Sequence, residues 1–272
     1  MFIKTPPLNR ALSTKHSYHL IDPSLNPWPY IGVSGVLIIT AGLVACTHNF
    51  KESSWTFFLY GVLLILYIMA FWWLDVSREA IFEDQHKIAV RRGLRYGTIL
   101  FIILEVMFFC AFFDSRLSPV FNIGGVWPPK SILPVPLSGI PLTNTFLLLS
   151  SGATVTWGHH AVVTQAKKHT IIAILITTAL AFLFTTLQGL EYTDTPFNIS
   201  DGIFGSCFYM TTGFHGFHVL VGTIALSVSF ARMVLNHYTN THHFGFEAAI
   251  WYWHFVDVVW IFLLGSLYWW GQ

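Results

Sequence analysis

The sequence predicts an all-α, polytopic membrane protein with seven transmembrane helices. Of its 272 residues, 54% are hydrophobic and only 10% are charged, whereas a water-soluble domain carries about a quarter charged residues. Seven apolar stretches are each close to the roughly 20 residues that a helix needs to cross a bilayer. These stretches are continuous and lack the period-two alternation of a barrel strand, so helices are the expected spans.

The first three stretches cover residues 30–47, 55–74 and 97–113. The first two contain no Asp, Glu, Lys or Arg, and the third contains one charged residue, Glu105. Between the second and third stretches lies a polar segment, 76–95, which we expect to form an interfacial helix or a structured loop.

The last four stretches cover residues 143–163, 170–190, 203–235 and 248–270. The preceding loop, 114–141, contains many prolines and cannot be one regular element. As a helix, stretch 203–235 would be on the order of 50 Å long, which exceeds the hydrocarbon core of about 30 Å. It should therefore tilt or protrude, and Gly213 and Gly216 would permit a close helix contact or a bend there.

Basic residues are distributed unevenly between the two sides of the membrane. Only Lys51, Arg116 and Lys130, of 14 basic residues, fall on the side opposite the N-terminus. Cytoplasmic or matrix loops carry the excess of Lys and Arg, so the N-terminus is expected inside and the C-terminus outside. The net charge of +1, with 14 basic and 13 acidic residues, gives no indication of a nucleic-acid partner.

Along the chain we expect a tail at residues 1–29 on the positive side and the first two helices at 30–74. A connecting segment at 75–96 and a bundle of helices three to seven at 97–272 should follow.

Glu105 lies near the middle of the third stretch. A carboxylate at that depth costs several kcal/mol unless it is protonated or paired. Two interpretations stay open: a proton or ligand role, or a neutral, hydrogen-bonded structural glutamic acid.

Three polar residues share one face of the last stretch. Glu247, His254 and Asp257 are separated by seven and three residues, and Trp251 lies on the same side. This stripe is either a buried proton relay or, as we favour, a set of hydrogen bonds between helices.

The histidines invite comparison with metal sites. His215 and His218 are three apart, and two adjacent pairs occur at 159–160 and 242–243. No carboxylate of suitable spacing is evident beside them, so no metal site is predicted. The cysteines, Cys46, Cys110 and Cys207, lack metal or disulfide spacing and are expected to act as small apolar residues.

Basic and aromatic residues gather at span ends on the positive side. Arg78, His86 and Arg232 lie there together with Glu79, and Trp72 and Trp73 lie just inside the membrane. Such groups suit anionic lipid headgroups, although ordinary topology-setting charge would give the same pattern.

Long motifs resemble the subunit III family of the haem–copper cytochrome c oxidases. The similar runs are HSYHLIDPSLNPWP, GLRYGTILFIILEVMFF from Gly93, SSGATVTWGHHA from Ser150, NISDGIFGSCFYMTTGFHGFHVLVGT from Asn198, and HHFGFEAAIWYWHFVDVVWIFLLGSLYWWG from His242. Together they extend over nearly the whole chain.

The resemblance implies seven helices, with the first two splayed from a five-helix bundle to leave a lipid-filled cleft. It implies a non-catalytic core subunit of respiratory complex IV in the mitochondrial inner membrane, with its N-terminus in the matrix and its C-terminus in the intermembrane space. Its partners would be subunits I and II, accessory subunits and phospholipids. Haem and copper would lie in partner subunits, and the cleft would line an oxygen path.

Residue by residue, Glu105 matches the family's membrane-embedded carboxylate. Trp73, Glu79, His86 and Arg232 match positions that contact phospholipid headgroups.

This chain departs from the family pattern in three places. Leu74 replaces an arginine of the family, and the first motif, SLNPWP, carries extra residues. About four residues are missing after the third stretch, so that helix is expected to end early, with Asp114 and Arg116 at its exit.

Three alternatives remain at this point. Subunit III of a quinol oxidase is the nearest, but the two spans before Trp73 argue against it because that branch typically lacks them. An independent haem or quinone oxidoreductase and a transporter are the others, and no internal repeat supports the transporter.

Overall fold

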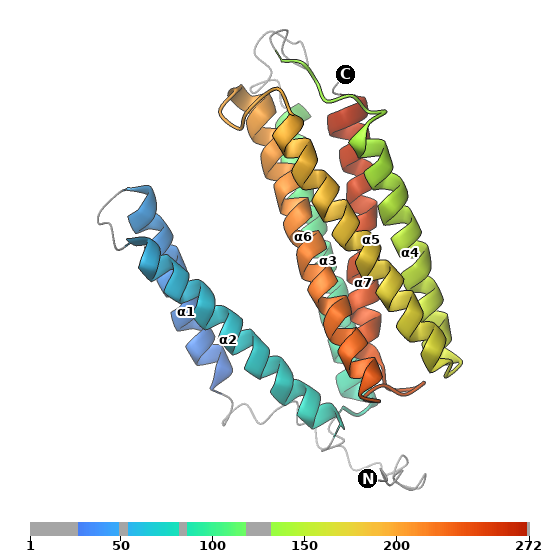
Figure 1. The fold of residues 1–272 in the computed structure, drawn as a ribbon. Coiled ribbons are helices and arrows are strands. Elements are labelled where there is room, and N and C mark those ends of the chain that lie inside the picture. Colours follow the sequence, from blue (N-terminus) through green and yellow to red (C-terminus); the bar gives the residue numbers. More distant parts are fainter. Residues whose placement is uncertain (1–26, 49–53, 82–85, 118–131, 271–272) are drawn as a thin grey trace, which may run out of the picture. The chain divides into compact units, whose positions relative to one another are not determined.

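A computed structural model describes residues 27–48, 54–81, 86–117 and 132–270 (Figure 1). This part of the chain folds into seven long α-helices and a final π-helical turn, without β-strands, which confirms the predicted all-α class. The elements are α1 (Trp28–Thr47), α2 (Ser54–Ile81), α3 (Ile88–Leu117), α4 (Ile140–Val163), α5 (Lys167–Asp194), α6 (Gly202–Val234), α7 (Phe244–Leu263) and η2 (Leu264–Trp269).

Six of the seven helices are long and apolar enough to cross a membrane. The exception is α4, which has 24 residues and the necessary length but is less apolar. It carries many amide, hydroxyl and imidazole side chains, several of them buried inside the bundle. That α4 spans the membrane as the seventh helix therefore remains a prediction.

The end of α2 and the start of α3 differ from the predicted boundaries, because the described residues of the polar segment 76–95 are largely helical. α2 continues to Ile81 and α3 begins at Ile88, so the expected separate interfacial element is absent from the described residues. α3 also continues to Leu117, one turn beyond the predicted end at 113. Asp114 therefore lies in its last turn rather than beyond the helix. That this helix ends earlier than in the family stays a prediction. Loop residues 132–139 are irregular, as predicted.

The chain divides into two compact units, residues 1–94 and 95–272. In the first unit, α1 and α2 form an antiparallel pair in close contact (Figure 1). Gly42 permits this approach, because a Cβ there would lie 2.8 Å from the backbone of Phe58. Near the start of α1, Trp28 Nε1–H donates to Asp75 Oδ2 at 2.7 Å. Asp75 follows Leu74, the position where the family has arginine, and its carboxylate is bound by the indole of Trp28.

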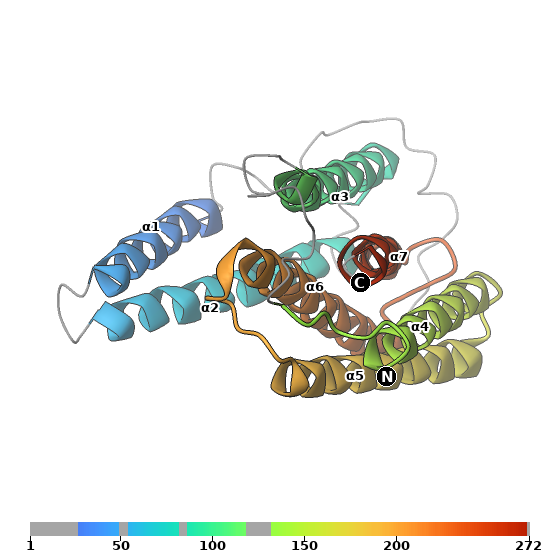
Figure 2. The same cartoon turned by 90° about the horizontal axis from the view of Figure 1, so that it is seen from above.

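In the second unit, α7 is the central helix, with α3, α4 and α6 around it (Figure 2). Its large side chains fill the core: Trp253, Trp260 and Phe246 are at most 1% exposed. Large apolar residues also cover the outside, and Leu104, Phe182 and Phe217 are 60–73% exposed. Water-soluble proteins rarely expose so much apolar surface, whereas lipid accommodates it.

Candidate functional site

Glu105 is paired inside the bundle. On α3 its Oε2 lies 2.9 Å from Nε2 of His218 on α6. The imidazole side chain is 8% exposed and the carboxyl side chain 24%. Sequence spacing alone could not reveal this partner, because 113 positions separate the two residues.

The second ring nitrogen of His218 restricts the protonation of this pair. Nδ1 lies 2.7 Å from the carbonyl oxygen of Phe214, which can only accept, so Nδ1 carries a proton. One further proton must then lie between Nε2 and Glu105. The pair is either a carboxylic acid donating to a neutral imidazole or a carboxylate accepting from an imidazolium.

Aromatic rings surround this pair. The rings of Phe109, Tyr252, Phe255 and Phe217 have centroids 5.2–6.1 Å from that of His218. Such rings supply few polar partners, so Glu105 and His218 satisfy each other. This arrangement suits a bond that holds α3 to α6.

The polar stripe of α7 divides into two groups. At the N-terminal end of α7, Glu247 accepts three hydrogen bonds from Arg95 of α3, at 2.8–3.1 Å. Seven residues later, His254 Nε2 lies 3.1 Å from Thr156 Oγ1 of α4. His254 Nδ1 lies 3.6 Å from Asp257 Oδ2. Each group connects α7 to a neighbouring helix.

Asp257 approaches α4 closely at Gly152. A Cβ at Gly152 would lie 2.5 Å from Asp257 Oδ2, so only glycine leaves room for the carboxyl group. Asp257 is 6% exposed, and its Oδ1 has no hydrogen-bond partner among the described residues.

A second buried carboxyl, that of Glu191, was not recognised from the sequence. Tyr268 O–H donates to Glu191 Oε1 at 2.6 Å, and Gln188 Nε2 donates to the same oxygen at 3.3 Å. Asn144 Nδ2 in turn donates to Gln188 Oε1 at 3.2 Å. The predicted span ends at residue 190, one residue before Glu191, whereas α5 continues to Asp194. The i, i+3 spacing of Gln188 and Glu191 was the available signal.

Further side-chain hydrogen bonds connect the helices of the second unit. Trp253 Nε1–H donates to Ser151 Oγ at 2.9 Å, and Trp260 Nε1–H donates to Thr145 Oγ1 at 3.0 Å. His215 Nε2–H donates to the carbonyl oxygen of Val256 at 3.2 Å. Most of the buried polar side chains of α4 and α7 thus connect helices.

Arg232 lies in the last turn of α6 and is partly enclosed. Its guanidinium carbon is 4.6 Å from the ring centroid of Tyr238, a cation–π contact. Burial raises the pKa of Tyr238, so its hydroxyl stays protonated. Arg232 Nε is buried without a hydrogen-bond partner among the described residues.

The other predicted headgroup residues belong to the first unit. Trp73 on α2 is 61% exposed. Glu79 lies in the last turn of α2, and His86 lies two residues before the start of α3. Both are half-buried and make contacts of their own.

Basic side chains of the second unit gather where α5 begins and α6 ends. Lys167 at the start of α5 donates to Asn236 Oδ1 at 2.6 Å and to the carbonyl oxygen of Val234 at 3.0 Å. Arg232 lies in the same turn as Val234. The beginning of α5 and the end of α6 therefore share one basic end of the bundle, as the predicted topology requires.

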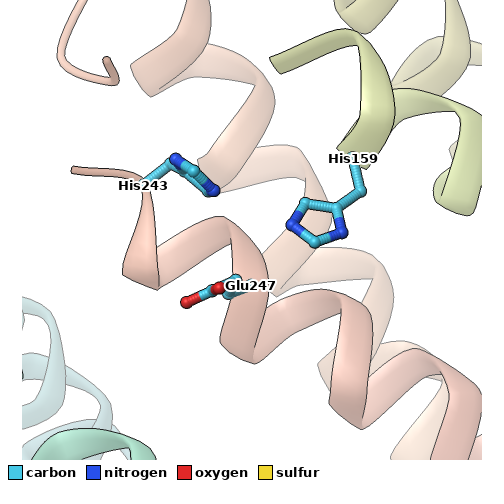
Figure 3. A group of neighbouring side chains, drawn as sticks. All are labelled: His159, His243 and Glu247. Atoms are coloured by element: carbon cyan, nitrogen blue, oxygen red, sulfur yellow. The ribbon is translucent and has the colours of Figure 1, made fainter. Parts of the chain in front are cut away.

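One group of side chains could hold a metal ion. His159, His243 and Glu247 bring one ligand atom each to within 4.8 Å of the others (Figure 3). The expectation that no carboxylate accompanies the histidines is wrong here. His243 and Glu247 are four residues apart, and helix packing adds His159 from α4.

Comparisons with known proteins agree with the resemblance. A family model described as Cytochrome c oxidase subunit III matches residues 16–272. A protein of Pylaiella littoralis named Cytochrome c oxidase subunit 3 is 54% identical over 261 residues, covering 94% of this chain and 95% of its own. Proteins of the same name from Marchantia polymorpha (52% over 265 residues, 96% and 99% covered) and Salmo salar (48% over 261, 94% and 98% covered) are also similar.

Proposed function

Since the chain belongs to the cytochrome c oxidase subunit III family, we propose that it is a non-catalytic core subunit of respiratory complex IV. In this role it packs against subunit I, stabilises the oxygen-reducing, proton-pumping centre there and contacts subunit II and accessory subunits. Haem and copper belong to the partner subunits, which transfer electrons from cytochrome c to oxygen. The observation that carries this proposal is the use of membrane-embedded polar groups, above all Glu105, in bonds between helices.

The proposed function of Glu105 follows from its partner. Glu105 is a structural acid that joins α3 to α6 through His218. A proton-transfer role would favour a hydrogen-bonded chain of titratable groups leading away from Glu105. Among the described residues its carboxyl bonds only to His218, and three of the four rings around that imidazole are phenylalanines, with Tyr252 the fourth.

We further propose that Trp73, Glu79, His86 and Arg232 hold structural phospholipids. Trp73 offers an exposed indole at the depth where aromatic residues favour headgroups. Arg232 offers a half-buried guanidinium in the last turn of α6, a cation that suits a phosphate oxygen. Oxygen is apolar and dissolves in lipid chains, so bound lipid would also line an oxygen path to subunit I.

The proposed location is the mitochondrial inner membrane, with the N-terminus in the matrix and the C-terminus in the intermembrane space. The excess of basic residues at the N-terminal side supports this orientation. The shared basic end of α5 and α6 supports it as well.

Membership of the complex is tested by affinity purification of the tagged chain in mild detergent. We expect large partner proteins to copurify with haem absorption bands and copper. After the partners are removed with harsher detergent, the chain itself should be colourless. Haem bands that stay with the isolated chain would contradict the proposal and favour an independent oxidoreductase.

A further inference from the structure

Three metal-ligating side chains meet where α4 ends and α7 begins (Figure 3). His159 comes from the last turns of α4, His243 immediately precedes α7, and Glu247 lies in its first turn. One ligand atom from each lies within 4.8 Å of the other two. We propose that these three residues form a binding site for zinc(II), independent of the lipid-binding role.

The donor set selects the class of metal. Two imidazoles and one carboxylate are typical zinc ligands in sites that keep a fourth position open, whereas calcium and magnesium prefer oxygen ligands. Tetrahedral zinc with bonds of about 2.0–2.1 Å would bring the ligand atoms to about 3.3 Å from one another. The ligand atoms now lie up to 4.8 Å from one another. To bind zinc, the most distant pair would have to approach by about 1.5 Å.

His243 is already oriented as a ligand. Its Nδ1 lies 2.9 Å from the carbonyl oxygen of Thr239, which can only accept, so Nδ1 carries the proton. In the neutral ring Nε2 keeps its lone pair, and such an outer hydrogen bond commonly fixes metal-bound histidines. His243 is 8% exposed, so packing also restrains the ring.

His159 faces His243 from α4. The two ring centroids are 5.7 Å apart, with an interplanar angle of 63°. Two imidazolium ions so close together would repel each other, whereas two neutral rings can share one cation. Zinc would therefore connect the end of α4 to the beginning of α7.

Arg95 orients the third ligand, Glu247, and also lowers its affinity for a cation. Two of its three hydrogen bonds go to Glu247 Oε2, at 2.8 and 3.1 Å, and one goes to Oε1 at 3.0 Å. A carboxylate oxygen has two acceptor positions, so Oε1 retains one for a metal. Because the guanidinium charge opposes a second cation, we infer that zinc binds reversibly.

The test uses the purified oxidase complex that contains this subunit. The complex is depleted of loosely bound metal, equilibrated with ZnCl₂ and analysed for zinc by plasma mass spectrometry. The wild type should bind one zinc more than His159→Gln or His243→Gln, whose affinity at this site should fall by at least about tenfold. His160→Gln is the matched control, because exposed His160 is adjacent on α4 but outside the group.

A measurement on the wild-type complex covers the case in which the variants fail to assemble. Zinc should protect His159 from modification by diethyl pyrocarbonate, mapped by peptide mass spectrometry, and should leave His160 as reactive as before. Equal zinc content in the wild type and both variants would overturn the proposal. Equal modification of His159 with and without zinc would do so as well.

Discussion

At the residue scale, the membrane-embedded carboxyl of Glu105 shows what sequence can and cannot predict. Its depth follows from its position within an apolar stretch, and so does the need for a partner. The partner, His218, follows only from helix packing, because it lies on α6. The stripe on α7 is similar: the shared face was predicted, whereas Arg95 and Thr156 emerge only in the folded chain.

Replacing Glu105 by glutamine should preserve assembly with at most a modest loss of activity. A glutamine amide can still donate to His218 Nε2. Glu105→Leu removes that partner and should destabilise the subunit by about 1–3 kcal/mol, the cost of a buried unpaired polar group. Turnover and the thermal midpoint of the purified complex measure both effects. Loss of turnover in Glu105→Gln, with intact metal centres, would show that the carboxyl acts in proton transfer.

Replacing Arg232 by alanine should reduce the phospholipid that copurifies with the complex and shorten its catalytic lifetime. One basic group near the headgroups contributes about 1 kcal/mol of attraction to anionic lipid. Lipid mass spectrometry measures the change, and Lys168→Ala is the control for charge alone, because Lys168 is an exposed basic residue at the start of α5. Unchanged lipid content in Arg232→Ala would count against the assignment.

At the element scale, the apolar stretches located all seven helices but not their ends. α2, α3 and α5 continue into polar sequence, since a helix can extend beyond the hydrocarbon core where its side chains meet headgroups and water. For the same reason Glu191 lies one residue beyond the predicted span and yet within α5. Gly213 and Gly216 make no close helix contact among the described residues, because no atom lies within 4 Å of a Cβ at either position. The alternative, a bend in this helix, stays a prediction.

Gly222 is the glycine of α6 that packs tightly against α7. A Cβ there would lie 2.9 Å from Cε3 of Trp253, which is fully buried and has little room to move. Gly222→Ala should therefore destabilise the bundle by about 1–3 kcal/mol. Gly213→Ala, in the same helix with open space, should be neutral or slightly stabilising. Thermal midpoints of the two assembled complexes compare them, and equal midpoints would refute this packing.

At the scale of the whole molecule, composition establishes the membrane class, but a helical bundle alone does not specify a function. Long motifs and the comparisons supply the family. The structure adds that several embedded polar residues, among them Glu105, Ser151 and Thr145, bond to side chains of neighbouring helices. It also brings together His159, His243 and Glu247, which no spacing rule predicted as a group.

The central claim is that this chain supports chemistry carried out by its partners. Its most direct test compares the complete complex with one from which this subunit has been removed. We predict that the depleted complex keeps its haem and copper spectra and its initial rate of oxygen reduction, but that its activity decays after fewer turnovers. Loss of a metal centre, or no oxygen reduction from the first turnover, would contradict the account.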